Sequence, residues 1–208
     1  NERIQFKSPI SSFGAIKEKI SQMATSCYIG ESACYRAAKD IENRTEVFLS
    51  EGMSHQESEL KGVEDFAIEC SLIKIGISED IMNCTDEGIQ IFGGMGFSAE
   101  APMESAWRDA RIGRIYEGTN EINRMLSIGM LLKKGIKGQI NLMEAVMNAK
   151  SDLLKSLDKK ETSPNTLSNE TELLINLKKI FLILIGKAVE KYGQDLDKKQ
   201  QVLMSLSD

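Results

Sequence analysis

The sequence predicts an all-α fold, an up-and-down, four-helix-type bundle followed by additional C-terminal helices. Three observations support this prediction. Ile, Leu, Met, Lys and Glu are plentiful, whereas only three of the 208 residues are proline and 6% are aromatic, a balance that favours helix over sheet. Apolar residues recur at helical spacing over long stretches. No segment of residues 1–135 shows the alternation of a half-buried strand.

Two long helices are predicted in the first half of the chain. Over residues 10–41, apolar residues recur mostly at steps of three, four or seven, which is the spacing of one helix face. The polar stretch 43–58, which contains Gly52, predicts a loop. A second helical pattern covers 60–91. The glycine cluster at 93–97 then predicts another loop, because glycine tolerates tight turns.

Two further helices are predicted to complete this bundle. Pro102 suits the first turn of a short helix, on which Glu104 and Arg108 are spaced to form an ion pair. Thr119 suits the N-cap of the next helix, because a hydroxyl oxygen can accept a hydrogen bond from a free backbone N–H there. That helix is predicted to end with Gly135 as its C-cap.

The last third of the chain is also predicted to be helical. Helices are expected over 140–157 and 170–196, joined by a polar linker, and a final helical pattern stops abruptly at the C-terminus. We therefore divide the chain into a helical domain at 1–135 and a C-terminal helical extension at 136–208. The abrupt stop indicates that the extension is incomplete and that the natural chain continues.

Charge and composition argue against several functional classes. The net charge of −5, with no dense basic patch, argues against nucleic-acid binding. The single histidine, His55, argues against a histidine-based metal site, and no metal is expected. The four cysteines form no CxxC pair and are predicted to be buried free thiols in a reducing compartment. No secretory signal is visible, and the longest apolar run, 180–186, is far shorter than the roughly 20 residues of a spanning helix. We expect a soluble intracellular protein.

One joint between predicted helices contains an acidic residue that helix capping does not explain. The joint lies in the stretch RIGRIYEGTNEINR, residues 111–124. A helix N-terminus favours hydroxyl and acidic side chains, which accounts for Thr119 and Glu121. It does not account for Glu117, which lies before the cap. Taken alone, the tetrapeptide YEGT is also compatible with a solvated turn between two helices.

Three motifs give the sequence a resemblance to a known family. They are RIQF at Arg3–Phe6, QIFGGMGF at Gln90–Phe97 and RDARIGRIYEGTNEINR at Arg108–Arg124. In this order, with helical patterns of suitable length between them, they make residues 1–135 resemble the C-terminal helical domain of the acyl-CoA dehydrogenases. Lys7 departs from the pattern, since a glycine is usual after the phenylalanine.

The resemblance implies an FAD-dependent acyl-CoA dehydrogenase of fatty acid β-oxidation. In this family a carboxylate removes a proton from Cα of an acyl-CoA thioester and a hydride passes from Cβ to FAD, which yields a 2-enoyl-CoA. Glu117 matches that catalytic base, and an apolar enclosure is expected to raise its pKa. The backbone N–H of Glu117 and a ribityl hydroxyl of FAD are the implied donors to the thioester oxygen. Tyr116 and Gly118 are assigned to substrate binding, where glycine permits close approach.

Six residues are assigned to FAD binding by the same resemblance. They are Arg3, Phe6, Gln90, Gly94, Thr119 and Glu121. The last two follow the base at a helix N-terminus, which suits phosphate or hydroxyl groups, although some relatives carry an amide in place of Glu121. The first four resemble residues that meet FAD across a subunit interface. A core position for Phe6 and a tight turn at Gly94 are the structural alternatives.

The implied partners are acyl-CoA as substrate, electron-transfer flavoprotein as electron acceptor, and a second copy of the chain in a homodimer or homotetramer. The extension at 136–208 resembles that of the very-long-chain branch, where it is associated with peripheral membrane contact and dimeric assembly. Packing of its apolar helix on its own bundle is the other interpretation. We expect a cytoplasmic protein in a bacterium, or one in the mitochondrial matrix or at the inner-membrane surface in a eukaryote.

Two other functions remain open from the sequence. One is an acyl-CoA oxidase-like flavoprotein, which differs in its electron acceptor, and the other is a catalytically silent helical module for assembly or membrane docking. The family's N-terminal helical and middle β-domains precede this region. The 208 residues alone are therefore expected to be inactive and to retain FAD weakly.

Overall fold

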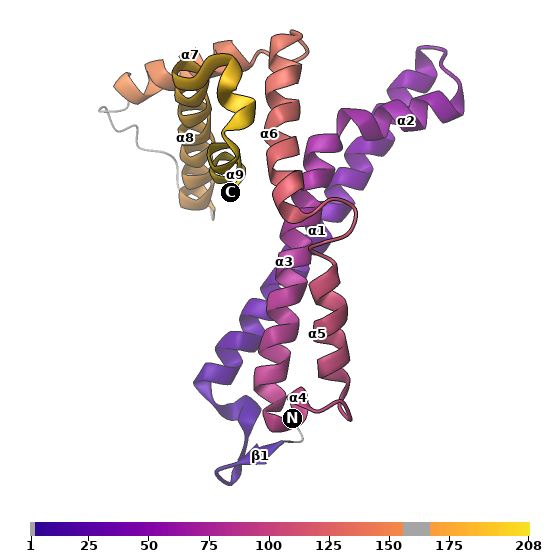
Figure 1. The fold of residues 1–208 in the computed structure, drawn as a ribbon, viewed down its shortest axis with the longest axis vertical. Helices are drawn as coiled ribbons and strands as arrows, with labels where there is room; N and C mark the ends of the chain where they lie inside the picture. Colours follow the sequence, from indigo (N-terminus) through magenta and orange to yellow (C-terminus); the bar gives the residue numbers. More distant parts are fainter. Residues whose placement is uncertain (1–2, 156–166) are drawn as a thin grey trace. The chain divides into compact units, whose positions relative to one another are not determined.

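The computed structural model describes residues 3–155 and 167–208, which are almost entirely α-helical (Figure 1). The all-α prediction is therefore confirmed. The chain divides into two compact units, Asn1–Asn123 (unit 1) and Arg124–Asp208 (unit 2). Helix α6, Asn120–Ile136, begins in unit 1 and continues into unit 2.

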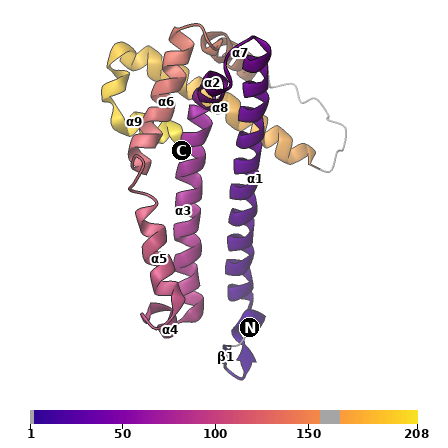
Figure 2. The same ribbon diagram turned by 90° about the vertical axis from the view of Figure 1, so that its right-hand side faces the viewer.

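Unit 1 begins with a short hairpin and continues as helices. Its elements are β1 (Ile4–Gln5), β2 (Ser8–Pro9), the 3₁₀ turn η1 (Ile10–Ser12), α1 (Gly14–Ser50), α2 (His55–Asp65), α3 (Ala67–Phe92), α4 (Gly94–Phe97) and α5 (Pro102–Ile112). Helix α3 lies between α1 and α5 and packs against both (Figure 2). These three helices position the candidate site.

The hairpin corrects the prediction that residues 1–135 contain no strand. Strands β1 and β2 are antiparallel, with Ile4 opposite Pro9. Phe6 and Lys7 form the turn, with φ of 52° and 64°. Positive φ at both residues of a two-residue turn matches the twist of paired strands. Strands of two residues are too short to produce an alternating pattern, so strand periodicity could not reveal them.

Helix α1 is longer than predicted. It continues past Ile41 to Ser50, and α2 begins at His55, so the loop predicted over 43–58 is limited to residues 51–54. Phe48 is buried and extends the inward face of the helix into this polar stretch. One buried aromatic side chain can therefore maintain a helix whose neighbouring residues are mostly polar.

The second predicted helix is two helices. A turn at Gly52 (φ 92°) precedes α2, which begins with a capping box. The Ser54 hydroxyl accepts from the N–H of Glu57, and the Glu57 carboxylate accepts from the N–H of Ser54. The pattern predicted as one helix over 60–91 breaks at Phe66, whose backbone is not helical.

The glycine cluster at 93–97 contains a turn and a short helix, so the loop predicted there is wrong. Gly93 (φ 66°) ends α3, and α4 follows at once. A Cβ on Gly96 would lie 2.5 Å from the carbonyl oxygen of Ile89. The absence of a side chain at Gly96 therefore lets α4 fold back onto the end of α3.

Helix α5 confirms two local predictions. Pro102 occupies its first turn. Arg108 and Glu104 form the expected ion pair, with the Arg108 Nη2 to Glu104 Oε1 distance at 2.7 Å. Trp107 donates its indole N–H to Asp86 on α3 at 3.1 Å, which ties α5 to its neighbour.

The four cysteines are free thiols, but two of them are not buried as predicted. Cys27 and Cys34 on α1 are exposed, whereas Cys70 and Cys84 on α3 are partly buried. The apolar stripe of α1 is wider than the surface that α3 covers, so the stripe alone overstates burial. Partial burial raises the pKa of the Cys70 and Cys84 thiols.

Unit 2 contains the rest of α6, α7 (Leu142–Lys155), α8 (Ser168–Tyr192), the 3₁₀ turn η2 (Gly193–Lys198) and α9 (Gln200–Ser207). The helix predicted over 140–157 is present from Leu142, and its last two predicted residues lie outside the described residues. The helix predicted over 170–196 is present as α8, with both ends shifted. Most of the linker predicted between them lies outside the described residues. The core of unit 2 is a cluster of buried apolar side chains, namely Ile128, Val146, Ile185, Ala188, Leu196 and Leu203.

Gly135 does not cap α6. The helix continues to Ile136, and Gly138 (φ 70°) makes the turn that follows. A Cβ on Gly135 would lie 3.0 Å from the Leu142 side chain, so this glycine allows close packing instead. Across the described parts of the chain, no helix combines the length and apolar character needed to cross a bilayer.

Candidate active site

The joint between α5 and α6 has a left-handed backbone at two consecutive residues. Glu117 has φ 54° and Gly118 has φ 82°. This conformation costs a residue with a side chain roughly 1–2 kcal/mol. Thr119 follows and accepts a hydrogen bond from the N–H of Ile122 at 3.3 Å, which confirms it as the cap of α6. The residues predicted for catalysis and substrate binding therefore lie in one tight turn.

The carbonyl groups of this turn are held by Asn123 from the first turns of α6. The Asn123 side-chain amide donates to the carbonyl oxygens of Gly118 at 2.8 Å and Thr119 at 3.3 Å. A longer contact of 3.5 Å reaches the carbonyl oxygen of Glu117. The Gly118 carbonyl accepts a second hydrogen bond, at 2.8 Å, from the ammonium group of Lys74 on α3.

Asn120 connects the turn to the interior of unit 1. Only 1% of its surface is exposed. Its side-chain oxygen accepts from Lys74 at 2.8 Å, and its side-chain nitrogen donates to Ser78 at 2.9 Å and to Glu79 at 3.0 Å. Among the described residues, no buried side-chain nitrogen or oxygen lacks a hydrogen-bond partner. The turn is thus anchored to α3 by a satisfied polar network.

An apolar groove of about 840 Å³ adjoins the turn. Residues of α1, α3 and α5 line it together with Tyr116 and Glu117. Its apolar lining includes eight alanine and isoleucine residues: Ala37, Ala38, Ile41, Ile73, Ile77, Ile81, Ala106 and Ala110. The Glu117 residue itself is exposed in this chain. A carboxylate beside an apolar groove can act as a general base toward a bound organic substrate.

The other predicted cofactor residues lie at the opposite end of α3. The Arg3 guanidinium donates to the carbonyl oxygen of Ile91 at 2.6 Å and lies against Gly93. Gln90 and Gly94 are exposed on either side of this contact. Gly94 has an ordinary φ, and a Cβ there would meet no atom within 4 Å, so neither backbone conformation nor packing in this chain demands a glycine.

Phe6 is at the tip of the hairpin and is 87% exposed, so its alternative as a core residue is wrong. Its ring contacts Phe13 edge-on, with 6.2 Å between ring centroids.

The stretch of α3 from Lys74, which contacts the turn, to Ile91, which contacts Arg3, is about 25 Å long. One chain therefore presents the predicted cofactor residues as two separate groups.

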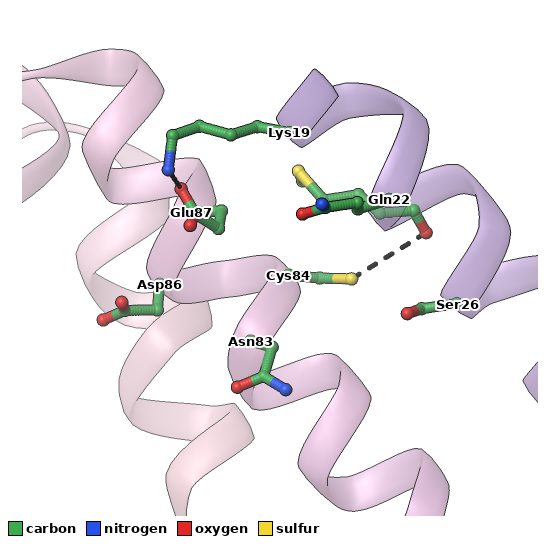
Figure 3. Close-up of a pocket in the computed structure, with 8 residues that line it drawn as sticks. Lys19, Gln22, Ser26, Asn83, Cys84, Asp86 and Glu87 are labelled. Atoms are coloured by element: carbon green, nitrogen blue, oxygen red, sulfur yellow. Dashed lines mark hydrogen bonds and ion pairs between the residues drawn. The ribbon is translucent and has the colours of Figure 1, made fainter. Parts of the chain in front are cut away.

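A smaller cleft of about 290 Å³ lies between α1 and α3 and contains none of the predicted site residues (Figure 3). Lys19 and Glu87 form an ion pair across it. The Cys84 thiol donates to the carbonyl oxygen of Met23 at 3.9 Å. Within residues 3–155 and 167–208, no three His, Cys, Asp or Glu side chains are grouped to hold a metal ion.

The motifs of this site match known family models. Residues 1–131 match a model described as acyl-CoA dehydrogenase, C-terminal domain, and residues 176–208 match a second model with the same description. The chain belongs to the acyl-CoA dehydrogenase family. This confirms the resemblance that the three sequence motifs carried.

Relatives and solved structures agree with the match to acyl-CoA dehydrogenases. The chain is 39% identical over 208 residues to a probable acyl-CoA dehydrogenase of Bacillus subtilis, covering 100% of this chain and 35% of that protein. It is 31% identical over 224 residues to a mitochondrial very long-chain specific acyl-CoA dehydrogenase of Bos taurus, covering 99% and 31%. A crystal structure of an acyl-CoA dehydrogenase complexed with FAD from Bacillus anthracis gives a TM-score of 0.94 at 39% identity, covering 100% and 35%. The chain spans about a third of the length of these relatives.

In this acyl-CoA dehydrogenase domain, sequence reasoning missed the residues that hold the turn. Lys74 lies between Ile73 and Ile77 within the apolar helical pattern over 60–91, so the pattern gave no reason to single it out. Asn120 and Asn123 lie three positions apart on α6. A lysine within an apolar stripe and two amides on one helix face were the signals that could have indicated a buried polar network.

Proposed function

We propose that this chain is the C-terminal domain of an FAD-dependent acyl-CoA dehydrogenase in which Glu117 is the catalytic base. The observation that carries the proposal is the anchored left-handed turn, which presents Glu117 beside an apolar groove. A side chain held at a costly φ by a buried network is typical of a functional position. The relatives, which include a probable acyl-CoA dehydrogenase and an acyl-CoA dehydrogenase complexed with FAD, support the same assignment.

In the proposed reaction, the Glu117 carboxylate takes the proton from Cα of the acyl-CoA thioester. A substrate bound in the groove would cover this exposed carboxylate and exclude water from it. The backbone N–H of Glu117 donates to no acceptor within the described residues, so it is available to the thioester oxygen as negative charge develops there. One residue would thus supply both the base and a hydrogen-bond donor to the enolate.

The residues present fit an FAD cofactor as two separate contacts. FAD, when bound, supplies the acceptor for the hydride that leaves Cβ. At the turn, the side chains of Thr119 and Glu121 would hold hydroxyl groups of the cofactor. At the other end of α3, the exposed Arg3 guanidinium suits a phosphate, and the open space at Gly94 allows close approach. Binding across a subunit interface would account for the separation of the two groups.

We extend the proposal to the partners of the complete enzyme. Its substrate would be a long-chain acyl-CoA, its electron acceptor an electron-transfer flavoprotein and its assembly a homodimer or homotetramer. The long-chain preference is supported by the match of 99% of this chain to the very long-chain specific bovine protein. Flavin reduction by acyl-CoAs of several lengths would reveal the preference.

The test of the base is Glu117→Gln in the complete enzyme of which this chain is a part. Removal of a general base is expected to lower the rate of flavin reduction by acyl-CoA about 10²–10⁴-fold, with FAD content unchanged. Glu100→Gln, an exposed carboxylate in the same unit, is the matched control and should leave the rate unchanged. Turnover of Glu117→Gln within about threefold of the unsubstituted enzyme would rule out the assignment.

A further inference from the structure

Lys74 is the longest-range contact of the turn that carries Glu117. Its ammonium group donates to the carbonyl oxygen of Gly118 and to the side-chain oxygen of Asn120, both at 2.8 Å. The first of these hydrogen bonds joins residues 44 positions apart in the chain. Lys74 also lines the groove that Glu117 adjoins.

The other hydrogen bonds to these carbonyl groups are local. Asn123 and the Thr119 cap lie at the start of α6, directly after the turn. They therefore fix the shape of the turn but not its location relative to α3. Lys74, Ser78 and Glu79 belong to α3 and fix where the turn lies against the groove. Lys74 contacts the backbone of the turn directly, at the residue next to Glu117.

This contact acts on a residue with a costly conformation. Glu117 at φ 54° gains roughly 1–2 kcal/mol by relaxing to a right-handed or extended backbone, and that relaxation would redirect its carboxylate. A charged donor to the next carbonyl group opposes the change, since hydrogen bonds to charged groups are about twice as strong as neutral ones. Two hydrogen bonds from one ammonium group therefore hold the turn in its strained form.

We propose that Lys74 is a positioning residue for the catalytic base, which it aligns by clamping the Gly118 carbonyl and Asn120 to α3. This inference rests on the proposed function of Glu117. It adds a residue that acts through the backbone of the turn and not on the substrate. Its removal should weaken proton abstraction without weakening the binding of acyl-CoA.

The kinetic test compares Lys74→Met with Lys19→Met in the complete enzyme. Lys19 is also a partly buried lysine in an ion pair between α1 and α3, but it lies in the separate cleft of Figure 3. For Lys74→Met we expect flavin reduction to slow roughly 10- to 100-fold, because small misplacement of a catalytic group has effects of that size. KM for acyl-CoA and FAD content should stay within about twofold. Lys19→Met should match the unsubstituted enzyme.

Two further readouts distinguish positioning from general damage to the fold. With an α-deuterated acyl-CoA, the kinetic isotope effect on flavin reduction should increase in Lys74→Met, since proton abstraction becomes more limiting. Lys74→Arg, which keeps the charge and the donors, should recover most of the rate. If Lys74→Met does not fold, Lys74→Gln keeps an uncharged amide donor and should give an intermediate rate with the same rise in isotope effect.

Amide hydrogen exchange tests the clamp independently of activity. The N–H groups of Asn120 and Ile122 are hydrogen-bonded within the turn, and both should exchange about tenfold or more faster in Lys74→Met than in Lys19→Met. Unchanged exchange, or a rate loss matched by FAD loss with no change in isotope effect, would overturn the proposal. If the unsubstituted enzyme does not reduce its flavin with acyl-CoA, the proposed function fails, whereas the exchange result still decides whether Lys74 holds the turn.

Discussion

Two turns of unit 1 place residues with side chains in left-handed conformations, and they are held in different ways. The hairpin turn has Phe6 and Lys7 at φ 52° and 64°, and the joint between α5 and α6 has Glu117 at φ 54°. The hairpin is held by two short strands and by the contact between Phe6 and Phe13. The joint is held by Asn123, Lys74 and the buried Asn120.

The difference distinguishes a left-handed conformation that contacts with another helix hold in place from one that has no such contacts. At the joint, a buried network ties the strained backbone to another helix, so the direction of the Glu117 side chain is fixed. At the hairpin, no contact of the Lys7 side chain with another described residue accounts for its conformation. A glycine would adopt that φ without penalty. The joint therefore has the structural support expected of a catalytic position, and the hairpin turn does not.

The largest effect in this comparison is expected from substitution of Gly118, one of the two glycines assigned to the site. In Gly118→Ala the backbone at φ 82° is strained, and the new Cβ lies 3.1 Å from the Asn123 amide nitrogen, which must give way by a few tenths of an ångström. We expect flavin reduction in the complete enzyme to slow about 100-fold, because the neighbouring Glu117 carboxylate is displaced. Stopped-flow measurement of flavin absorbance with acyl-CoA provides the rate.

Gly94→Ala is the matched control for Gly118→Ala. Its backbone is ordinary and no atom lies within 4 Å of the added Cβ. The free energy of unfolding should change by no more than about 0.5 kcal/mol. A loss of more than about 1 kcal/mol in Gly94→Ala would show that the backbone is also constrained at this end of α3, and the comparison between the two glycines would fail.

The sequence could predict the local features of this site but not its long-range support. Thr119 as a cap and Pro102 as a helix start depend on neighbouring residues only, and both predictions were right. Gly135 was wrongly predicted to end α6. A glycine required for packing, such as Gly135 against Leu142, and a glycine required for a positive φ, such as Gly138, look alike in the sequence. Spacing along one helix cannot distinguish these two causes.

Contacts between distant segments account for most of what was missed. The hydrogen bond from Lys74 to Gly118 joins segments that share no sequence pattern, so no periodicity reveals it. The extent of α1 depended on whether Phe48 finds a buried site, which is decided by α2 and not by α1 itself. The family motifs identified Glu117 as a candidate base, whereas the structure supplied the network that holds it.

A smaller effect is expected from removal of the local clamp. Asn123→Ala deletes the donor to the carbonyl groups of Gly118 and Thr119 and leaves a partly buried acceptor with fewer partners. The complete enzyme should lose about 1–3 kcal/mol of unfolding free energy in urea denaturation. Asn83→Ala, at an exposed position on α3, should change it by less than about 0.5 kcal/mol. Equal effects of the two substitutions would mean that the amide of Asn123 does not hold the joint.

The smallest effect is expected at the hairpin, and it has the opposite sign. In Lys7→Gly, relief of a left-handed penalty of about 1–2 kcal/mol exceeds the roughly 0.4–1 kcal/mol that glycine adds to the entropy of the unfolded chain. The complete enzyme should therefore become more stable by up to about 1 kcal/mol in urea denaturation. Lys17→Gly, an exposed lysine within α1, should instead destabilise it by about 0.5–1 kcal/mol. Destabilisation by Lys7→Gly would show that the side chain of Lys7 supports the turn. The hairpin turn would then be held by side-chain contacts, as the joint between α5 and α6 is.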